Sequence, residues 1–206
     1  VSVILIQFSC SQPKKNNELS GLSADTLQLA KAKLQEYIDQ GKMAGISALI
    51  YKDGKTVYRE NFGYADLDAQ KPMEDNTIFR IFSMTKPITA VALMTLYDEG
   101  KFELDDKVAD YIPEFAETQV YNPETKSLEP QQNELTIRHL LTHTSGIPYG
   151  WDQNAYVDSL YRTSGAGGWD GTIGEKVKIM ASLPLKFQPG TKWEYGLSID
   201  VAGYLV

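Results

Sequence analysis

Ser83 and Lys86 are the residues whose types and spacing could do chemistry, because they stand three positions apart at the start of an expected helix. Residues three apart on a helix are neighbours, so the lysine ammonium is expected beside the serine hydroxyl. A serine hydroxyl is a weak nucleophile until a neighbouring group takes its proton, and a buried lysine with a lowered pKa can take it. The pair therefore predicts acylation of Ser83, with the helix N-terminus favouring negative charge on its oxygen.

The Ser-x-x-Lys spacing alone is weak, because it also occurs at Ser11 and Lys14 in a polar stretch where both side chains should be solvated. Ser83 differs because it opens an apolar segment. Residues 83–99 are apolar on nearly every side beyond the first turn, and Gly100 closes the segment. This pattern predicts a helix buried at the centre of the protein. The alternative interpretation is that Ser83 only caps the helix and Lys86 extends into solvent.

A helix and a β-hairpin are expected ahead of this pair. Apolar residues recur at helical spacing after Ser23, which is typical of an N-cap, and they stop at Gly41. Asp53-Gly54 separates two β-rich runs and is a strong hairpin signal. Together they indicate a layered α/β (α+β) fold. Further expected elements are short helical pieces over 104–115, a polar insert over 122–133, a helix over 136–143, a mobile surface loop over 164–174 and an apolar helix beginning at 198.

Composition argues against several functions. The chain has 206 residues, enough for one domain or two small ones, and its net charge of −7 argues against a nucleic-acid partner. The single cysteine permits neither an intrachain disulfide nor a cysteine-based metal site. His139 and His143 are four apart but lack the glutamate of His-Glu-x-x-His and a third ligand, so a structural role at the helix end is predicted. Residues 165–174 are glycine-rich without a phosphate-binding spacing, so no nucleotide is expected. With the cysteine and histidine patterns, this predicts neither a metal nor a cofactor.

The N-terminus has the pattern of a processed leader. Residues 1–8 are apolar, Ser9-Cys10 follows, and 11–17 are polar. The apolar run is too short to span a bilayer, which takes about 20 residues, but it fits the end of a signal peptide. The segment resembles a bacterial lipoprotein processing site, which predicts a lipid on Cys10, a membrane tether and a place in the bacterial cell envelope, periplasm-facing or secreted. A buried N-terminal strand with an incidental cysteine is the alternative.

Three motifs occur in the order found in one family. They are Thr-Ile-Phe-Arg-Ile-Phe-Ser-Met-Thr-Lys-Pro at 77–87, His-Leu-Leu-Thr-His-Thr-Ser-Gly-Ile at 139–147 and Pro-Gly-Thr-Lys-Trp-Glu-Tyr at 189–195. From about Leu27 onward the chain resembles serine β-lactamase-related hydrolases, which include class C β-lactamases, D-alanyl-D-alanine peptidases and esterases. The resemblance implies a β-lactamase/penicillin-binding-protein-like fold with an antiparallel sheet and an all-helical subdomain.

The resemblance also implies roles for particular residues. Ser83 would be the nucleophile, Lys86 its base or proton relay, and Tyr195 a second acid/base that protonates the leaving group. The backbone N–H of Ser83 would form half of an oxyanion hole. Tyr195 could instead simply pack beside Trp193. Tyr149, with Trp151, is a candidate for the rim of the substrate pocket, and Ser145 is expected to be a turn residue.

Two departures from the family pattern bear on the substrate and on the extent of the chain. The lactamase and peptidase branches usually have Tyr-x-Asn, whose amide holds the substrate, whereas here the tyrosine is followed by Gly196 and Leu197. Leu197, taken as a substrate-binding position, favours the esterase branch. No Lys-Thr-Gly or His-x-Gly triplet occurs, so it is expected beyond Val206, in a longer protein of which this is the N-terminal part only.

The sequence therefore predicts a leader and tether over 1–22 and an incomplete β-lactamase-related domain over 23–206, divided into 23–82 and 83–206. The predicted function is hydrolysis of esters or amides through an acyl-serine, most simply by a carboxylesterase acting on a small-molecule ester, amide or lactam. The alternatives are a β-lactamase or D-alanyl-D-alanine carboxypeptidase and, in another class, a non-catalytic relative that binds peptidoglycan or a partner protein.

Overall fold

The computed structural model describes residues 18–19 and 21–206, which form parts of two compact units, Val1–Arg80 and Ile81–Val206. The boundary between the units falls two residues before the predicted division at 82/83. Cys10 and the predicted processing site lie outside the described residues. Within residues 18–19 and 21–206, none of the helices combines the length and apolar character that crossing a membrane requires.

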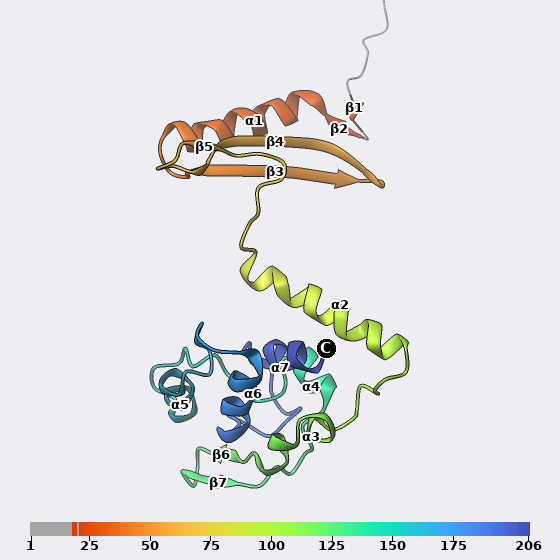
Figure 1. The fold of residues 1–206 in the computed structure, drawn as a ribbon, viewed down its shortest axis with the longest axis vertical. Coiled ribbons are helices and arrows are strands. Elements are labelled where there is room, and N and C mark those ends of the chain that lie inside the picture. The colour runs from red at the N-terminus through yellow and green to blue at the C-terminus, as the bar shows by residue number, and fades with distance from the viewer. Residues whose placement is uncertain (1–17, 20) are drawn as a thin grey trace, which may run out of the picture. The chain divides into compact units, whose positions relative to one another are not determined.

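The described part of the first unit consists of one helix, a three-stranded antiparallel sheet and a separate two-stranded sheet (Figure 1). Helix α1 spans Ala24–Asp39, and the side chain of Ser23 accepts a hydrogen bond from Thr26 N, so the predicted N-cap is confirmed. Asp53 and Gly54 have φ angles of 51° and 75°, which suit the tight turn predicted for the hairpin. The strands are β1 (Glu18–Leu19), β2 (Leu22–Ser23), β3 (Gly45–Lys52), β4 (Lys55–Asp66) and β5 (Lys71–Pro72), with β3, β4 and β5 adjacent in that order.

The second unit begins with the segment that carries the Ser-x-x-Lys pair. Helix α2 spans Thr85–Asp98, and Ser83 lies in the 3₁₀ turn η1 (Phe82–Met84) that precedes it. Within this unit Leu93 on α2 is buried, whereas Ile88 and Val91 are 60% and 64% exposed, so burial of the helix on nearly every side stays a prediction. Within the second unit, α2 packs principally against α7 (Ser198–Leu205), which lies beside it in Figure 1.

Short helices around one hydrophobic core make up the rest of the second unit. Its centre is formed by side chains that are fully buried, among them Val108, Leu140, Val177, Leu185 and Val201. The predicted helices at 136 and 198 are confirmed, whereas the predicted polar insert is a hairpin of two short strands. The elements are α3 (Val108–Tyr111), η2 (Pro113–Glu117), β6 (Val120–Asn122), β7 (Ser127–Glu129), α4 (Ile137–Leu141), α5 (Tyr156–Ser164) and α6 (Ile173–Ser182).

Candidate active site

Ser83 is positioned by a strained turn and by the first turn of α2. Phe82 has a φ of +47°, a left-handed conformation that is costly for a side chain of this size. The 3₁₀ turn that follows leaves Ser83 exposed, and Lys86 lies one turn later, half-buried. Nζ of Lys86 donates to Ser83 Oγ at 3.4 Å. The structure therefore places the two predicted residues side by side.

Two tyrosines from distant parts of the chain converge on Lys86. Tyr149 OH accepts a hydrogen bond from Lys86 Nζ at 2.8 Å. The Tyr195 ring centroid lies 4.9 Å from the same nitrogen and 5.5 Å from the Tyr149 ring. Trp151 stacks on Tyr149 with a centroid distance of 4.4 Å and an interplanar angle of 5°. Ser83, Lys86, Tyr149 and Tyr195 thus form one cluster, with an aromatic wall beside it.

The electrostatics of this cluster differ from the expected neutral lysine base. Burial alone would lower the pKa of Lys86, but hydrogen bonds to Tyr149 and Tyr195 outweigh burial, and its pKa is raised. Hydrogen bonds from Ser83 and Lys86, together with the lysine charge, lower the pKa of Tyr195. The prediction that Lys86 has a lowered pKa is therefore wrong, because its partners are phenols that stabilise the cation. The lowered pKa makes Tyr195 the stronger candidate for the group that accepts a proton.

The Tyr195 segment approaches the neighbouring loop too closely for any side chain at Gly196. A Cβ built there would lie 1.9 Å from the carbonyl oxygen of Ile147. Gly196 N donates to His143 Nδ1 at 3.4 Å, and Glu194 N donates to the carbonyl oxygen of His143 at 2.9 Å. The residue after Tyr195 is therefore glycine because the two backbones meet there.

Leu197 does not lie where a substrate could contact it. Its side chain is 4% exposed and belongs to the hydrophobic core of the second unit, and its carbonyl oxygen accepts from Asp200 N at the start of α7. The predicted substrate contact at Leu197 is wrong for this structure, because an apolar side chain at this point is drawn into the core. Ser145 is also buried and shares a hydrogen bond with Ser198, which fits its expected role in the turn.

A partly buried ionic cluster, which the sequence did not predict, holds the two tyrosine-bearing segments together. Lys186 Nζ lies 2.8 Å from Asp158 Oδ2 and 2.6 Å from Glu194 Oε1. Asp158 is 1% exposed, and its Oδ1 accepts from Asp152 N at 3.1 Å, next to Trp151. Burial would lower the pKa of Lys186, but the bonds to the two carboxylates raise it. No sequence pattern joins these three charged residues.

Neither histidine lies in a metal-binding arrangement. His139 caps the start of α4: its Nδ1 accepts from Thr136 N, and its own N–H donates to Thr136 Oγ1. His143 contacts the Tyr195 segment instead. Across residues 18–19 and 21–206, three or more His, Cys, Asp or Glu side chains nowhere gather as a metal ion would need. The predicted lipid site at Cys10 lies outside the described residues.

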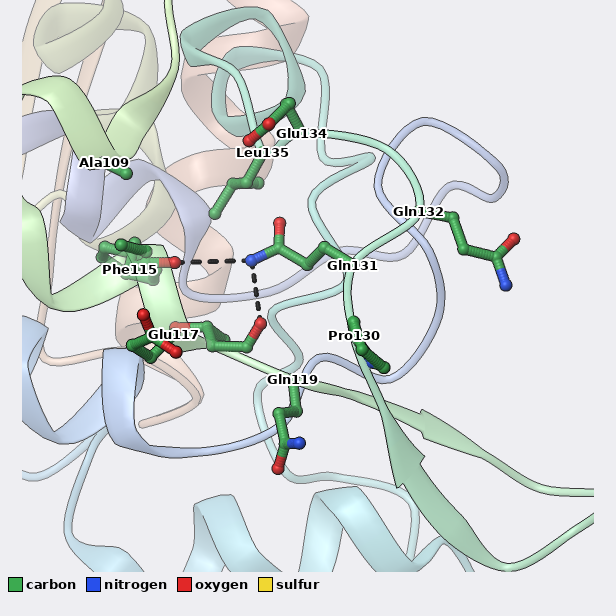
Figure 2. A pocket seen from close by; sticks show the side chains of 11 residues that line it. Ala109, Phe115, Glu117, Gln119, Pro130, Gln131, Gln132, Glu134 and Leu135 are labelled. Carbon is green, nitrogen blue, oxygen red and sulfur yellow. Dashed lines mark hydrogen bonds between the residues drawn. The ribbon is translucent and has the colours of Figure 1, made fainter.

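A separate hollow of about 270 Å³ lies between η2 and residues 130–135 (Figure 2). Gln131 reaches across it, and its Nε2 donates to the carbonyl oxygens of Phe115 and Thr118 at 3.4 and 2.8 Å. The lining residues include none of the predicted site residues. This hollow is therefore distinct from the Ser83 cluster.

The geometry around Ser83 is that of the Ser-x-x-Lys class of acylating sites, in which a serine is flanked by a lysine and a second proton-transfer group. The beta-lactamase family profile matches residues 30–206, and the chain belongs to this family. The resemblance drawn from the three motifs is thereby confirmed.

Individual relatives agree with this assignment. The chain is 35% identical over 193 residues to esterase EstB of Burkholderia gladioli, and this alignment covers 91% of this chain and 47% of EstB. EstCE1, described as a hydrolase with promiscuous acyltransferase activity, is 31% identical with a TM-score of 0.70 and covers 89% of this chain and 47% of its own. A class C beta-lactamase structure shares the fold at 20% identity, with a TM-score of 0.62 over 90% of this chain and 45% of its own. The chain spans about half the length of these relatives.

Proposed function

We propose that the protein is a serine hydrolase that cleaves carboxylic esters through an acyl-serine intermediate. The observation that carries the proposal is the cluster in which Lys86 Nζ lies 3.4 Å from Ser83 Oγ and 4.9 Å from the Tyr195 ring centroid. Hydrogen bonds to Ser83 and Lys86 lower the pKa of Tyr195, which supports it as the proton acceptor. A phenolate held beside an ammonium is a base that works closer to neutral pH than a free tyrosine. Lys86, whose pKa is raised, stays charged and stabilises the phenolate.

The proposed reaction has two steps. In the first step, Tyr195 takes the Ser83 proton as Oγ attacks the ester carbonyl carbon. The same tyrosine then gives that proton to the departing alkoxide, and Ser83 remains as an acyl-serine. Water, deprotonated by Tyr195, attacks the acyl carbon, and the returned proton regenerates Ser83 with release of a carboxylic acid. The backbone N–H of Ser83 is the proposed donor to the oxyanion in both steps.

Three observations favour esters over lactams and peptides. The position two residues after Tyr195 holds Leu197, a core side chain without an amide to hold a peptide-like substrate. The wall beside Lys86 is aromatic, formed by Tyr149 and by Trp151, which is 66% exposed. The similarity to esterase EstB supports the same choice. Short-chain esters are the proposed substrates.

The test is to incubate the protein, expressed from its complete reading frame, with p-nitrophenyl butyrate and separately with a fluorophosphonate probe. We expect hydrolysis of the ester, and a mass shift that peptide mapping assigns to Ser83. Ser83→Ala should abolish both, while Tyr195→Phe should slow hydrolysis by about 10²- to 10⁴-fold. Ser11→Ala, which removes the other Ser-x-x-Lys match, is the control and should change neither.

Three results would contradict the proposal. Full activity in Ser83→Ala would remove the nucleophile assignment. Turnover of nitrocefin, or a stable penicillin adduct without ester hydrolysis, would favour a β-lactamase or D-alanyl-D-alanine carboxypeptidase instead. Binding of muropeptides by a protein inert to every acylating probe would favour the non-catalytic alternative.

We also propose that Cys10 carries a lipid that tethers the protein in the bacterial cell envelope. The support is the pattern in residues 1–17, an apolar run followed by Ser-Cys and a polar stretch. Labelling cells with a fatty-acid probe should tag the protein, and Cys10→Ala should lose the tag and leave the membrane fraction. An untagged protein that stays in the membrane fraction would overturn the proposal.

A further inference from the structure

His143 contacts both sides of Tyr195 from the loop that follows α4. Its carbonyl oxygen accepts from Glu194 N at 2.9 Å, and its Nδ1 accepts from Gly196 N at 3.4 Å. Its ring lies 4.8 Å from the Tyr195 ring, at an interplanar angle of 43°. One residue therefore binds the backbone N–H groups of the residues before and after the tyrosine and also packs against the tyrosine ring.

The backbone conformation of His143 argues that its side chain is needed. Its φ is +56°, in the left-handed region where glycine, and less often asparagine, usually ends a helix. A histidine there costs about 1–2 kcal/mol relative to glycine. If the turn alone mattered, glycine would serve better. The imidazole, which reaches back to Gly196 and Tyr195, offsets that cost.

The bond from Gly196 requires one particular form of the imidazole. Nδ1 can accept only when the ring is neutral and its proton is on Nε2. Burial lowers the pKa of His143, and the charge of Lys86 lowers it further. Lys86 and Tyr195 are titratable groups that face the ring, and the Trp193 ring lies edge-on to it with the two ring centroids 6.3 Å apart. The imidazole is therefore neutral near pH 7, and Nδ1 can accept.

We propose that His143 is a positioning residue that fixes the Tyr195 hydroxyl between Ser83 and Lys86. It does not touch the reacting atoms; it acts through the backbone and ring of the tyrosine. This inference rests on the proposed function, in which Tyr195 transfers the proton. Loss of the contact lets the phenol move away from Lys86, so the pKa of Tyr195 returns toward its ordinary value.

His139 is a natural control for His143. It lies four residues earlier, and its Nδ1 also accepts one backbone hydrogen bond, from Thr136 N. Its ring packs against the backbone of Gly190, where an added Cβ would lie 2.8 Å from Nε2. A general loss of histidine packing would affect both positions, whereas loss of tyrosine positioning should follow only from changes at His143.

The experiment compares His143→Ala, His143→Asn and His139→Asn in the protein expressed from its complete reading frame. Asparagine tolerates the left-handed φ and keeps an acceptor close to the place of Nδ1. We expect His143→Ala to lower kcat on p-nitrophenyl butyrate by about 10- to 100-fold, with KM within about twofold. The part of its pH profile in which kcat rises with pH, as Tyr195 loses its proton, should move to higher pH. His143→Asn should recover most of kcat, and His139→Asn should leave the pH profile unchanged.

Two outcomes overturn the inference: a wild-type pH profile in His143→Ala, or equal losses of kcat without a pH shift at both histidines. If His143→Ala does not fold, His143→Gln decides, because it keeps polarity but moves the acceptor and should still shift the profile. Phenolate absorbance during a pH titration, with Tyr195→Phe subtracted, reads the Tyr195 pKa without turnover. A wild-type protein that does not label with fluorophosphonate refutes the proposed function. A Tyr195 titration unchanged in His143→Gln, and in His143→Ala where that variant folds, refutes the positioning role.

Discussion

The two units of the chain are built in different ways. In the described part of the first unit, only Leu27 and Phe62 are buried apolar side chains, and its elements follow from local signals such as the Asp53-Gly54 turn. The second unit buries a core drawn from many separated segments, and all four side chains of the site cluster belong to it. Local turn and cap signals thus suffice to form elements, but the chemistry depends on contacts between residues far apart in the sequence.

The largest expected effect comes from Gly196→Ala, which attacks a long-range contact of the second unit. The new Cβ would lie 1.9 Å from the Ile147 carbonyl oxygen, so one of the two backbones must move. We expect a loss of about 4 kcal/mol or more in the free energy of unfolding, together with loss of hydrolysis. Chemical denaturation measures the first. The control is Gly167→Ala, whose nearest atom would be a Leu197 methyl at 3.7 Å; equal losses in both variants would refute the contact.

A matched pair of leucines tests the difference in burial between the units. Leu140 is fully buried in the second unit, and Leu29 on α1 is 71% exposed. Leu140→Ala should lower the free energy of unfolding by about 3 kcal/mol, because it leaves a cavity in a packed core. Leu29→Ala should change it by less than about 0.5 kcal/mol. Urea denaturation of both variants checks this, and similar losses would show that Leu29 is packed in solution rather than exposed.

Gly54→Ala tests whether local conformation alone governs the first unit. Gly54 has a φ of +75°, and a Cβ there would meet no atom within 4 Å, so the cost comes from backbone strain without a clash. We expect a loss of about 1 kcal/mol, smaller than at Gly196. Gly54→Asn should recover part of it, because asparagine tolerates this region. A loss as large as that of Gly196→Ala would mean that the turn has tertiary contacts.

The smallest expected effect is a pH-dependent one at Asp200, near Lys86. Burial raises the pKa of Asp200 above its ordinary value of 3.8, although the lysine charge opposes this. A raised folded-state pKa stabilises the protein below pH 3.8, and that contribution is lost as pH rises through the folded pKa. Asp200→Asn should therefore unfold at a slightly higher temperature than the wild type at pH 7, and the difference should vanish near pH 3. A difference that grows as the pH falls would reverse the assignment.

Part of the site was predictable from the sequence. The Ser83–Lys86 spacing placed the two side chains on adjacent turns, and the structure puts Nζ 3.4 Å from Oγ. The contact between Lys86 and Tyr149 joins residues 63 positions apart, and no local pattern encodes it. The predicted lowering of the Lys86 pKa was wrong for the same reason. Burial can be anticipated from an apolar helix, but the phenols that stabilise the cation come from other segments.

The fold was predictable where a cap or a turn announces an element. Ser23 and Asp53-Gly54 were interpreted correctly, because their effect is local. Helix α6 was missed although Thr172 and Glu175 form a capping box at its start, since the surrounding glycines indicated a loop. The apolar sequence of α2 shows what this helix could bury, but not which elements pack against it.

Strand β3 has a practical consequence for anyone handling pieces of this protein. It forms one edge of its sheet, and among the described residues no strand pairs with its outer side along Gly45–Lys52. An open strand edge is a template on which other chains add by backbone hydrogen bonding. A fragment ending at Arg80 would carry this eight-residue edge, so we expect it to be open to pairing with its own copies.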